Sequence, residues 1–143
     1  YIVKQLKAYK DKTRSNLNAQ RFMWGMVARL SDEEIEALGA YYENQAPLHS
    51  SKISDQKKYD AGLALFTQGN PEKGVPACSA CHGDKGQGNI EIPRLAGQHE
   101  EYLKKQLKIF YGNQRPAAVA MHEIVKGISD SDIEALAQYL QAQ

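Results

Sequence analysis

An internal repeat constrains the fold of this chain more than any other feature of its sequence. YIVKQLKAYKDKTR (1–14) matches YLKKQLKIFYGNQR (102–115) at a shift of 101 residues, and LSDEEIEALGAYYENQ (30–45) matches ISDSDIEALAQYLQAQ (128–143) at a shift of 98. Such self-similarity indicates a duplicated structural unit. We therefore expect residues 1–46 to be the rear half of a first unit, residues 47–53 to be a linker, and residues 54–143 to be a complete unit.

The expected secondary structure is helical in both units. Apolar residues recur at helical spacing, and Ser31 followed by three acidic residues is typical of a helix start. Further helices are predicted near 54–68, 99–111 and 129–142, and no alternating pattern indicates a strand. Residues 69–97 are rich in Gly and Pro and predict an ordered loop. The predicted fold class is all-α.

The overall composition excludes some functions. The formal charge is +1, which gives no argument for nucleic-acid binding. No apolar run approaches the roughly 18 residues that would indicate a membrane span. The opening YIVKQLKAYK resembles the interior of an amphipathic helix and carries no capping residue, so we expect it to continue from residues that precede it.

The stretch CSACH, residues 78–82, holds both cysteines of the chain. A disulfide would close a very small loop and constrain the unfolded chain little. A redox dithiol would normally lie in a βαβ pattern, which is not predicted here. Zinc would need a second cluster of ligands, and the remaining histidines have no cysteine beside them. We expect those histidines to be surface residues: His49, His99 and His122. Covalent attachment of haem c through Cys78 and Cys81, with His82 as the proximal ligand, is the favoured interpretation.

A haem held by His82 would need a sixth ligand to act as a high-potential electron carrier, and methionine supplies one. Met121 is the only methionine of residues 54–143, in a stretch predicted to be irregular after Arg115 and Pro116. It could instead fill a gap in the core, and His122 is the competing ligand. The repeat favours Met121, because Met23 occupies the matching position in residues 1–46.

Taken together, GLALFTQGN, GVPACSACHGDKGQGN, IPRLAGQHEEYLKKQLKIF and ISDSDIEALAQYL resemble a class I cytochrome c, and most closely the second domain of a cytochrome c4. That family carries two haem domains in tandem. The resemblance covers 54–143, and 1–46 resembles the rear half of a first domain. It implies a class I cytochrome c fold, helices and loops around haem c, with a partial repeat of the same fold.

The resemblance also implies roles for individual residues. Cys78 and Cys81 would form the thioethers, His82 and Met121 would be the axial ligands, and Leu95 would pack on the haem. The Pro93 carbonyl would accept a hydrogen bond from the proximal imidazole. Arg115 would either pair with a haem propionate or be solvated. Gly62 and Phe66 would lie where the first helix of this unit crosses the C-terminal helix. On the C-terminal helix, Leu136 and Tyr139 stand at that crossing.

One haem c per chain is implied, because CSACH is the only attachment motif in the sequence. Met23 would be an axial ligand of a second haem only where the front half of a first domain is present. Without it, residues 1–46 would expose apolar helix faces around Met23 and Trp24, which would favour packing on the intact domain or self-association.

The implied function is electron transfer without catalysis, from a membrane-bound quinol–cytochrome c oxidoreductase to a haem–copper terminal oxidase. Because bacteria attach haem c outside the cytoplasm, the periplasm is the expected location. An alternative is a haem c electron-entry domain or subunit of a larger dehydrogenase or oxidase. A third interpretation, an enzyme with a catalytic haem, would require a sixth position that is open or held by His or Cys.

Overall fold

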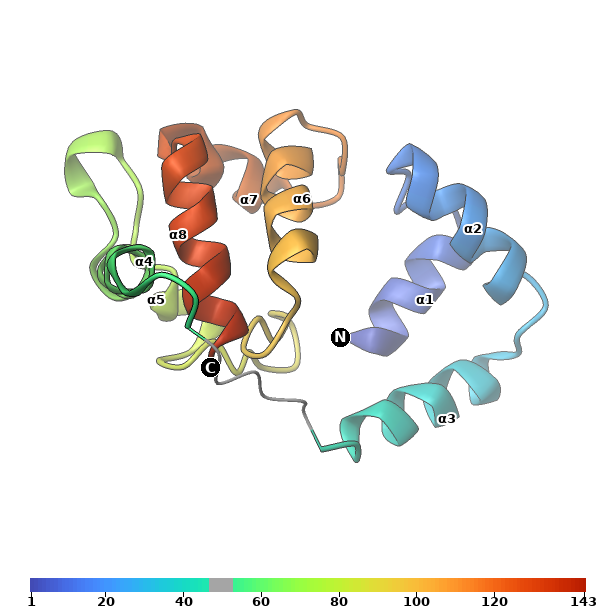
Figure 1. Ribbon diagram of the computed structural model, residues 1–143. Coiled ribbons are helices and arrows are strands. Elements are labelled where there is room, and N and C mark those ends of the chain that lie inside the picture. Colours follow the sequence, from blue (N-terminus) through green and yellow to red (C-terminus); the bar gives the residue numbers. More distant parts are fainter. Residues whose placement is uncertain (47–52) are drawn as a thin grey trace.

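The computed structural model describes residues 1–46 and 53–143 (Figure 1). Within these residues the chain forms helices and no strand, apart from one isolated bridge between Asn70 and Val75. The predicted all-α class is thus confirmed. Residues 47–52, which include His49 and most of the expected linker, lie outside the described residues. The helices are α1 (Ile2–Lys10), α2 (Leu17–Val27), α3 (Asp32–Glu43), α4 (Gln56–Gln68), α5 (Ser79–His82), α6 (Glu100–Tyr111), α7 (Val119–Ile124) and α8 (Asp130–Gln141), with 3₁₀ turns at Pro71–Lys73 and Val125–Gly127.

The sequence repeat is also a structural repeat. Shifting α3 by 98 residues gives the bounds of α8, and both helices begin with a capping box, built on Ser31 in α3 and on Ser129 in α8. A capping box satisfies two backbone donors at the helix start, so it fixes where the helix begins. α1, α2 and α3 lie together on one side of the molecule, and α4 to α8 lie on the other (Figure 1).

The core of residues 53–143 is built around the crossing of α4 and α8. Phe66 is fully buried, and its ring centroid lies 5.3 Å from that of Tyr139. Gly62 faces the α8 backbone, where an added Cβ would collide with the carbonyl oxygen of Ala135. The predicted crossing of these helices is therefore confirmed, and it is close because position 62 carries no side chain.

Substitution at Gly62 tests this close approach. We expect Gly62→Ala to lower the free energy of unfolding by about 2 kcal/mol, because forced overpacking outweighs the helix propensity of Ala. Gly25→Ala in α2 is the matched control, since an added Cβ there has no neighbour within 4 Å. Denaturant unfolding of the haem-loaded variants measures both changes. Equal effects of the two substitutions would contradict the proposed role of Gly62.

The first repeat has no counterpart of α4 within the described residues. As a consequence Tyr41 and Tyr42 of α3 are 59% and 54% exposed, whereas their counterparts in α8, Tyr139 and Leu140, are each 3% exposed. On α2, Phe22 is also exposed, at 78%. The expected exposed apolar faces are therefore present. The division into domains and the self-association of residues 1–46 stay predictions.

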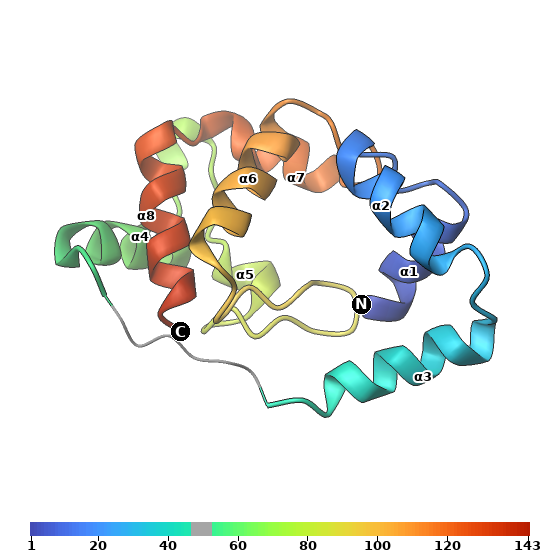
Figure 2. The same ribbon diagram turned by 45° about the vertical axis from the view of Figure 1, so that its right-hand side comes forward.

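The two repeats meet through polar contacts. The start of α1 lies beside the loop that follows α5 (Figures 1 and 2), and there the Lys4 ammonium donates to the Glu91 carboxylate at 2.7 Å. Both side chains are exposed, so this ion pair contributes little to stability. A second contact joins Arg115 to Tyr1 just before α1, where it is exposed, and to Gln5 of α1, where it is partly buried.

Candidate functional site

The CSACH stretch forms a single helical turn. Cys78 is the N-cap of α5, and Cys81 and His82 are in its last turn. Residues three and four apart lie on one side of a helix, so His82 shares a face with Cys78. Cys78 is half-buried, Cys81 is exposed, and both are free thiols. Burial raises the pKa of the Cys78 thiol, which keeps the unmodified side chain protonated.

His82 is buried and held in one orientation. Its Nδ1 lies 2.9 Å from the Pro93 carbonyl oxygen, so this nitrogen carries the proton and donates it. Burial lowers the pKa of His82, an effect that the bond to Pro93 only partly opposes. The lowered pKa favours the neutral ring, in which Nε2 keeps the lone pair that a metal requires.

The loop after α5 brings Pro93 to the ring. The His82 carbonyl accepts from Gly88 N at 2.7 Å, and Gly88 has φ +71°, a conformation that favours glycine. An added Cβ at position 88 would lie 2.6 Å from the Pro93 carbonyl carbon. Gly88 thus permits the close turn that brings the Pro93 carbonyl to the His82 ring.

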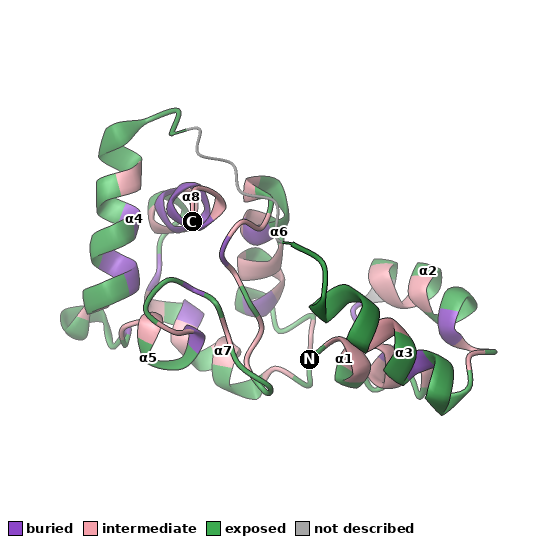
Figure 3. Ribbon diagram, turned by 90° about the horizontal axis from the view of Figure 1, so that it is seen from below, coloured by how far each residue is buried: buried purple, intermediate pink, exposed green. Residues whose placement is uncertain are grey.

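Three side chains of the expected site pack against the same hydrophobic core. Cys78, Leu95 and Met121 are each partly buried and pack against the main hydrophobic core. They come from α5, from the following loop and from α7. Figure 3 shows α5 and α7 on the same side of α8. Elements on one side of α8 and the loop between them thus supply three of the sequence-predicted residues, each packed on the same core.

The environment predicted for Met121 was wrong in one respect. It lies within helix α7, not in an irregular stretch. The expectation that His122 is a surface residue was also wrong. His122 is partly buried, and its Nε2 lies 2.9 Å from the Arg115 carbonyl oxygen. That contact engages the competing ligand and leaves Met121 as the better candidate. His99 is exposed, as predicted.

Arg115 makes contacts that the sequence did not indicate. Its guanidinium donates to the side chains of Gln106, Gln5 and Tyr1, at 3.4, 2.8 and 3.1 Å. No carboxylate of the described residues lies within ion-pair distance of it. Arg115 is half-buried and hydrogen-bonded, and both expectations for it, pairing with a haem propionate or solvation, stay predictions. Met23 is half-buried in α2, and its role also stays a prediction.

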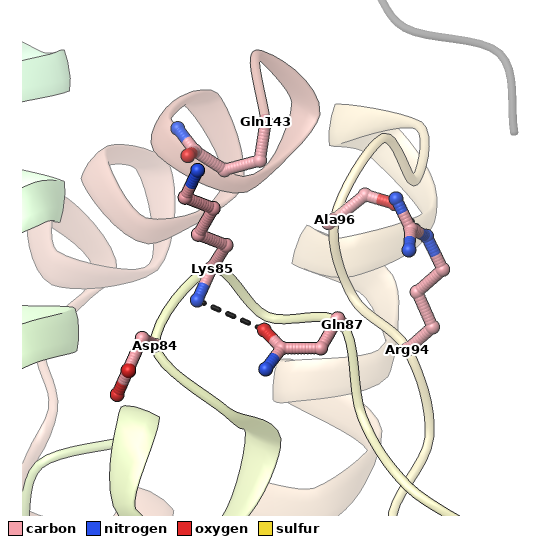
Figure 4. Close-up of a pocket in the computed structure, with 6 residues that line it drawn as sticks. All are labelled: Asp84, Lys85, Gln87, Arg94, Ala96 and Gln143. Carbon is pink, nitrogen blue, oxygen red and sulfur yellow. Dashed lines mark hydrogen bonds between the residues drawn. The ribbon is translucent and has the colours of Figure 1, made fainter.

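Two surface cavities lie away from the residues expected to attach and ligate the haem. One of about 370 Å³ is lined by Asp84, Lys85, Gln87, Arg94, Ala96 and Gln143, and Lys85 N donates to Gln87 Oε1 there (Figure 4). Another of about 800 Å³ lies between α6 and the α1–α2 pair, with Arg14, Phe22 and Gln106 among its lining residues. Neither is lined by Cys78, His82 or Met121.

Comparison with known proteins bears on what this site holds. Residues 59–143 match the family Cytochrome c. The chain is 39% identical to cytochrome c4 of Thiocapsa roseopersicina, over 99% of its own length and 72% of that protein. It is 37% identical to cytochrome c-552 of Acidithiobacillus ferridurans and spans 61% of that relative's length.

Other similar proteins point the same way. The solved structure of cytochrome c4 from Acidithiobacillus ferrooxidans superposes with a TM-score of 0.92 at 38% identity, covering 100% of this chain and 84% of that one. A protein named thiosulfate dehydrogenase electron acceptor, from Thiomonas intermedia, is 34% identical over 100% of this chain and 66% of that protein.

An all-α fold with a CxxCH turn and a carbonyl-anchored histidine defines a protein of the class that attaches haem c covalently. The chain belongs to the cytochrome c family, and its similarity extends over almost the whole chain to cytochrome c4. The predicted family, the class I cytochrome c fold with its partial repeat, and haem c as cofactor are thereby confirmed.

The residues present fit that cofactor. Cys78 and Cys81 satisfy the attachment motif, and a neutral, buried imidazole stands directly after them. Cys78, Leu95 and Met121 are each partly buried against the hydrophobic core, so each keeps apolar surface that a flat apolar ring could cover. Polar side chains bond elsewhere: His122 to Arg115, and Arg115 to α1.

Proposed function

We propose that this protein is an electron carrier in which His82 and Met121 are the axial ligands of one haem c. The observation that carries the proposal is the buried His82, whose Nδ1 is committed to Pro93 while Nε2 keeps its lone pair. When bound, the haem iron takes up and releases one electron. Because His82 and Met121 would both hold the iron, no position would be left open for a substrate, so we propose a carrier rather than an enzyme.

Each residue of the site contributes a separate property. Pro93 fixes the orientation and tautomer of His82 and raises its basicity as a ligand. Thioether ligation by Met121 would favour the ferrous state and hence a high reduction potential. Leu95 and Cys78 exclude water from the apolar side of the site by packing on the core.

The proposed partners are a quinol–cytochrome c oxidoreductase as donor and a haem–copper terminal oxidase as acceptor, with the periplasm as location. Support for the location is chemical, since thioether attachment takes place outside the bacterial cytoplasm. In the described residues no helix is both long and apolar enough to cross a membrane. Residues 47–143 hold eleven Lys and Arg and eleven Asp and Glu, so contact with partners would depend less on long-range charge than on apolar surface.

A second candidate function is favoured by one finding. The relative from Thiomonas intermedia is named for accepting electrons from thiosulfate dehydrogenase. This chain is also similar to part of a solved thiosulfate dehydrogenase, TsdBA from Marichromatium purpuratum. The match has 32% identity and covers 30% of that chain. The chain would then be an electron-accepting subunit or domain of such a complex.

Stopped-flow reduction of the ferric protein distinguishes the two candidates. We expect rapid reduction by quinol in the presence of a quinol–cytochrome c oxidoreductase, followed by oxidation by a terminal oxidase. Thiosulfate dehydrogenase with thiosulfate serves as the competing donor. Faster reduction by that enzyme would favour the second candidate, and failure of both donors would contradict electron transfer as proposed here.

A further inference from the structure

We infer that Arg115 is a positioning residue that connects the first repeat to α7 and thereby holds Met121 in place. The inference rests on the proposed function, because it concerns the proposed ligand Met121. It adds a role for residues 1–46: α1 supplies part of the support of a site that is built in the other repeat.

The guanidinium of Arg115 is fixed from both repeats. Its Nη1 donates to Gln106 within its own repeat, and its Nη2 donates to the Gln5 side-chain oxygen at 2.8 Å and to the Tyr1 hydroxyl at 3.1 Å. The guanidinium carbon also lies 5.2 Å from the centre of the Phe110 ring. Side-chain contacts on three sides leave the planar group little rotational freedom.

The backbone of Arg115 continues the connection toward the site. Its carbonyl oxygen accepts from Nε2 of His122 at 2.9 Å, and His122 directly follows Met121 in α7. The His122 ring also lies 6.5 Å from the Phe110 ring. Because α7 has only six residues, its own helical hydrogen bonds fix it weakly, and this side-chain contact is a larger part of what orients it.

Comparison of the two repeats shows which part of the arrangement is particular to Met121. Arg14, the counterpart of Arg115, lies over Tyr9 as Arg115 lies over Phe110, and it donates to the same Gln5 oxygen at 2.6 Å. Both arginines thus meet at one acceptor. The counterpart of His122 is Trp24, which instead has the Lys12 ammonium over its ring. The bond from α7 to the arginine carbonyl is therefore formed only in the second repeat.

Imidazole binding by the ferric, haem-loaded protein tests the inference, because imidazole must displace Met121 from the iron. Loss of one hydrogen bond is expected to raise the affinity for imidazole about five-fold. We expect this result for His122→Phe, which keeps an aromatic ring, and for Gln5→Leu, which keeps the side-chain size. Gln5→Leu also removes the acceptor of Arg14, but of its two lost bonds only the one to Arg115 leads to α7. Both substitutions break the same connection from α1 through Arg115 to α7. The double variant is therefore expected to show the same change in imidazole affinity as each single variant, and not the product of the two changes.

Lys4→Ala is the matched control. It removes a different polar contact between the repeats, the exposed pair with Glu91, without touching Arg115, and is expected to leave imidazole affinity unchanged. Far-ultraviolet circular dichroism and haem content identify any variant that fails to fold. Unchanged affinity in folded Gln5→Leu, or multiplied effects in the double variant, would overturn the inference. A wild-type protein without the near-infrared band of methionine-ligated ferric haem would overturn the proposed function itself.

Discussion

Replacing both Cys78 and Cys81 by Ala is expected to abolish covalent haem attachment. Each thiol would form one thioether bond, and no other cysteine is present in the chain to replace them. The measurement is haem staining of the denatured protein on a gel, together with its intact mass. Wild type should keep its haem after denaturation, and the double variant should show none.

Ser79→Ala is the control, because Ser79 lies between the cysteines in the same turn but supplies no thiol. The single substitutions should differ from each other. Cys78 packs against the core, so Cys78→Ala loses packing as well as a bond, whereas Cys81 is exposed and Cys81→Ala loses the bond alone. Haem that stays attached in the double variant would contradict the assignment of these residues.

Much of the fold was predictable because its signals are local. The start of α3 was predicted from Ser31 and the acidic residues after it, and the structure has a capping box at that point. The repeat then predicts the same kind of helix start at Ser129, where α8 has its capping box. The bond from His82 to Pro93, eleven positions away, was implied by the family resemblance. The helical turn at CSACH was not predicted, because it is a single turn within residues 69–97, which read as loop.

The remainder depended on contacts between distant residues. α7 was missed because it has only six residues, too few for an amphipathic pattern, and begins just beyond Pro116. The sequence indicates either a propionate partner or a solvated charge at Arg115, and it gives no sign that the guanidinium contacts Gln5, 110 residues away. No pattern in one sequence identifies such a pair. The repeat offered one usable signal, since Gln5 and Arg14 recur as Gln106 and Arg115.

Met121→Ala is expected to remove the near-infrared band of ferric methionine-ligated haem and to lower the reduction potential. The band depends on the bond from sulfur to iron, which Ala cannot form. The fall in potential should be a substantial part of the roughly 0.8 V over which axial ligands set haem potentials. Absorbance spectroscopy and potentiometric titration of the purified variant measure the two effects.

The repeat provides the control for this experiment, because Met23 is the counterpart of Met121 and is likewise half-buried. Residues 1–46 contain no CxxCH, so Met23→Ala should leave band and potential unchanged in this chain. A band that survives Met121→Ala would exclude Met121 as the ligand. His122 would then be the residue to test, and its release from the Arg115 carbonyl would have to accompany binding to iron, since the same Nε2 makes that hydrogen bond.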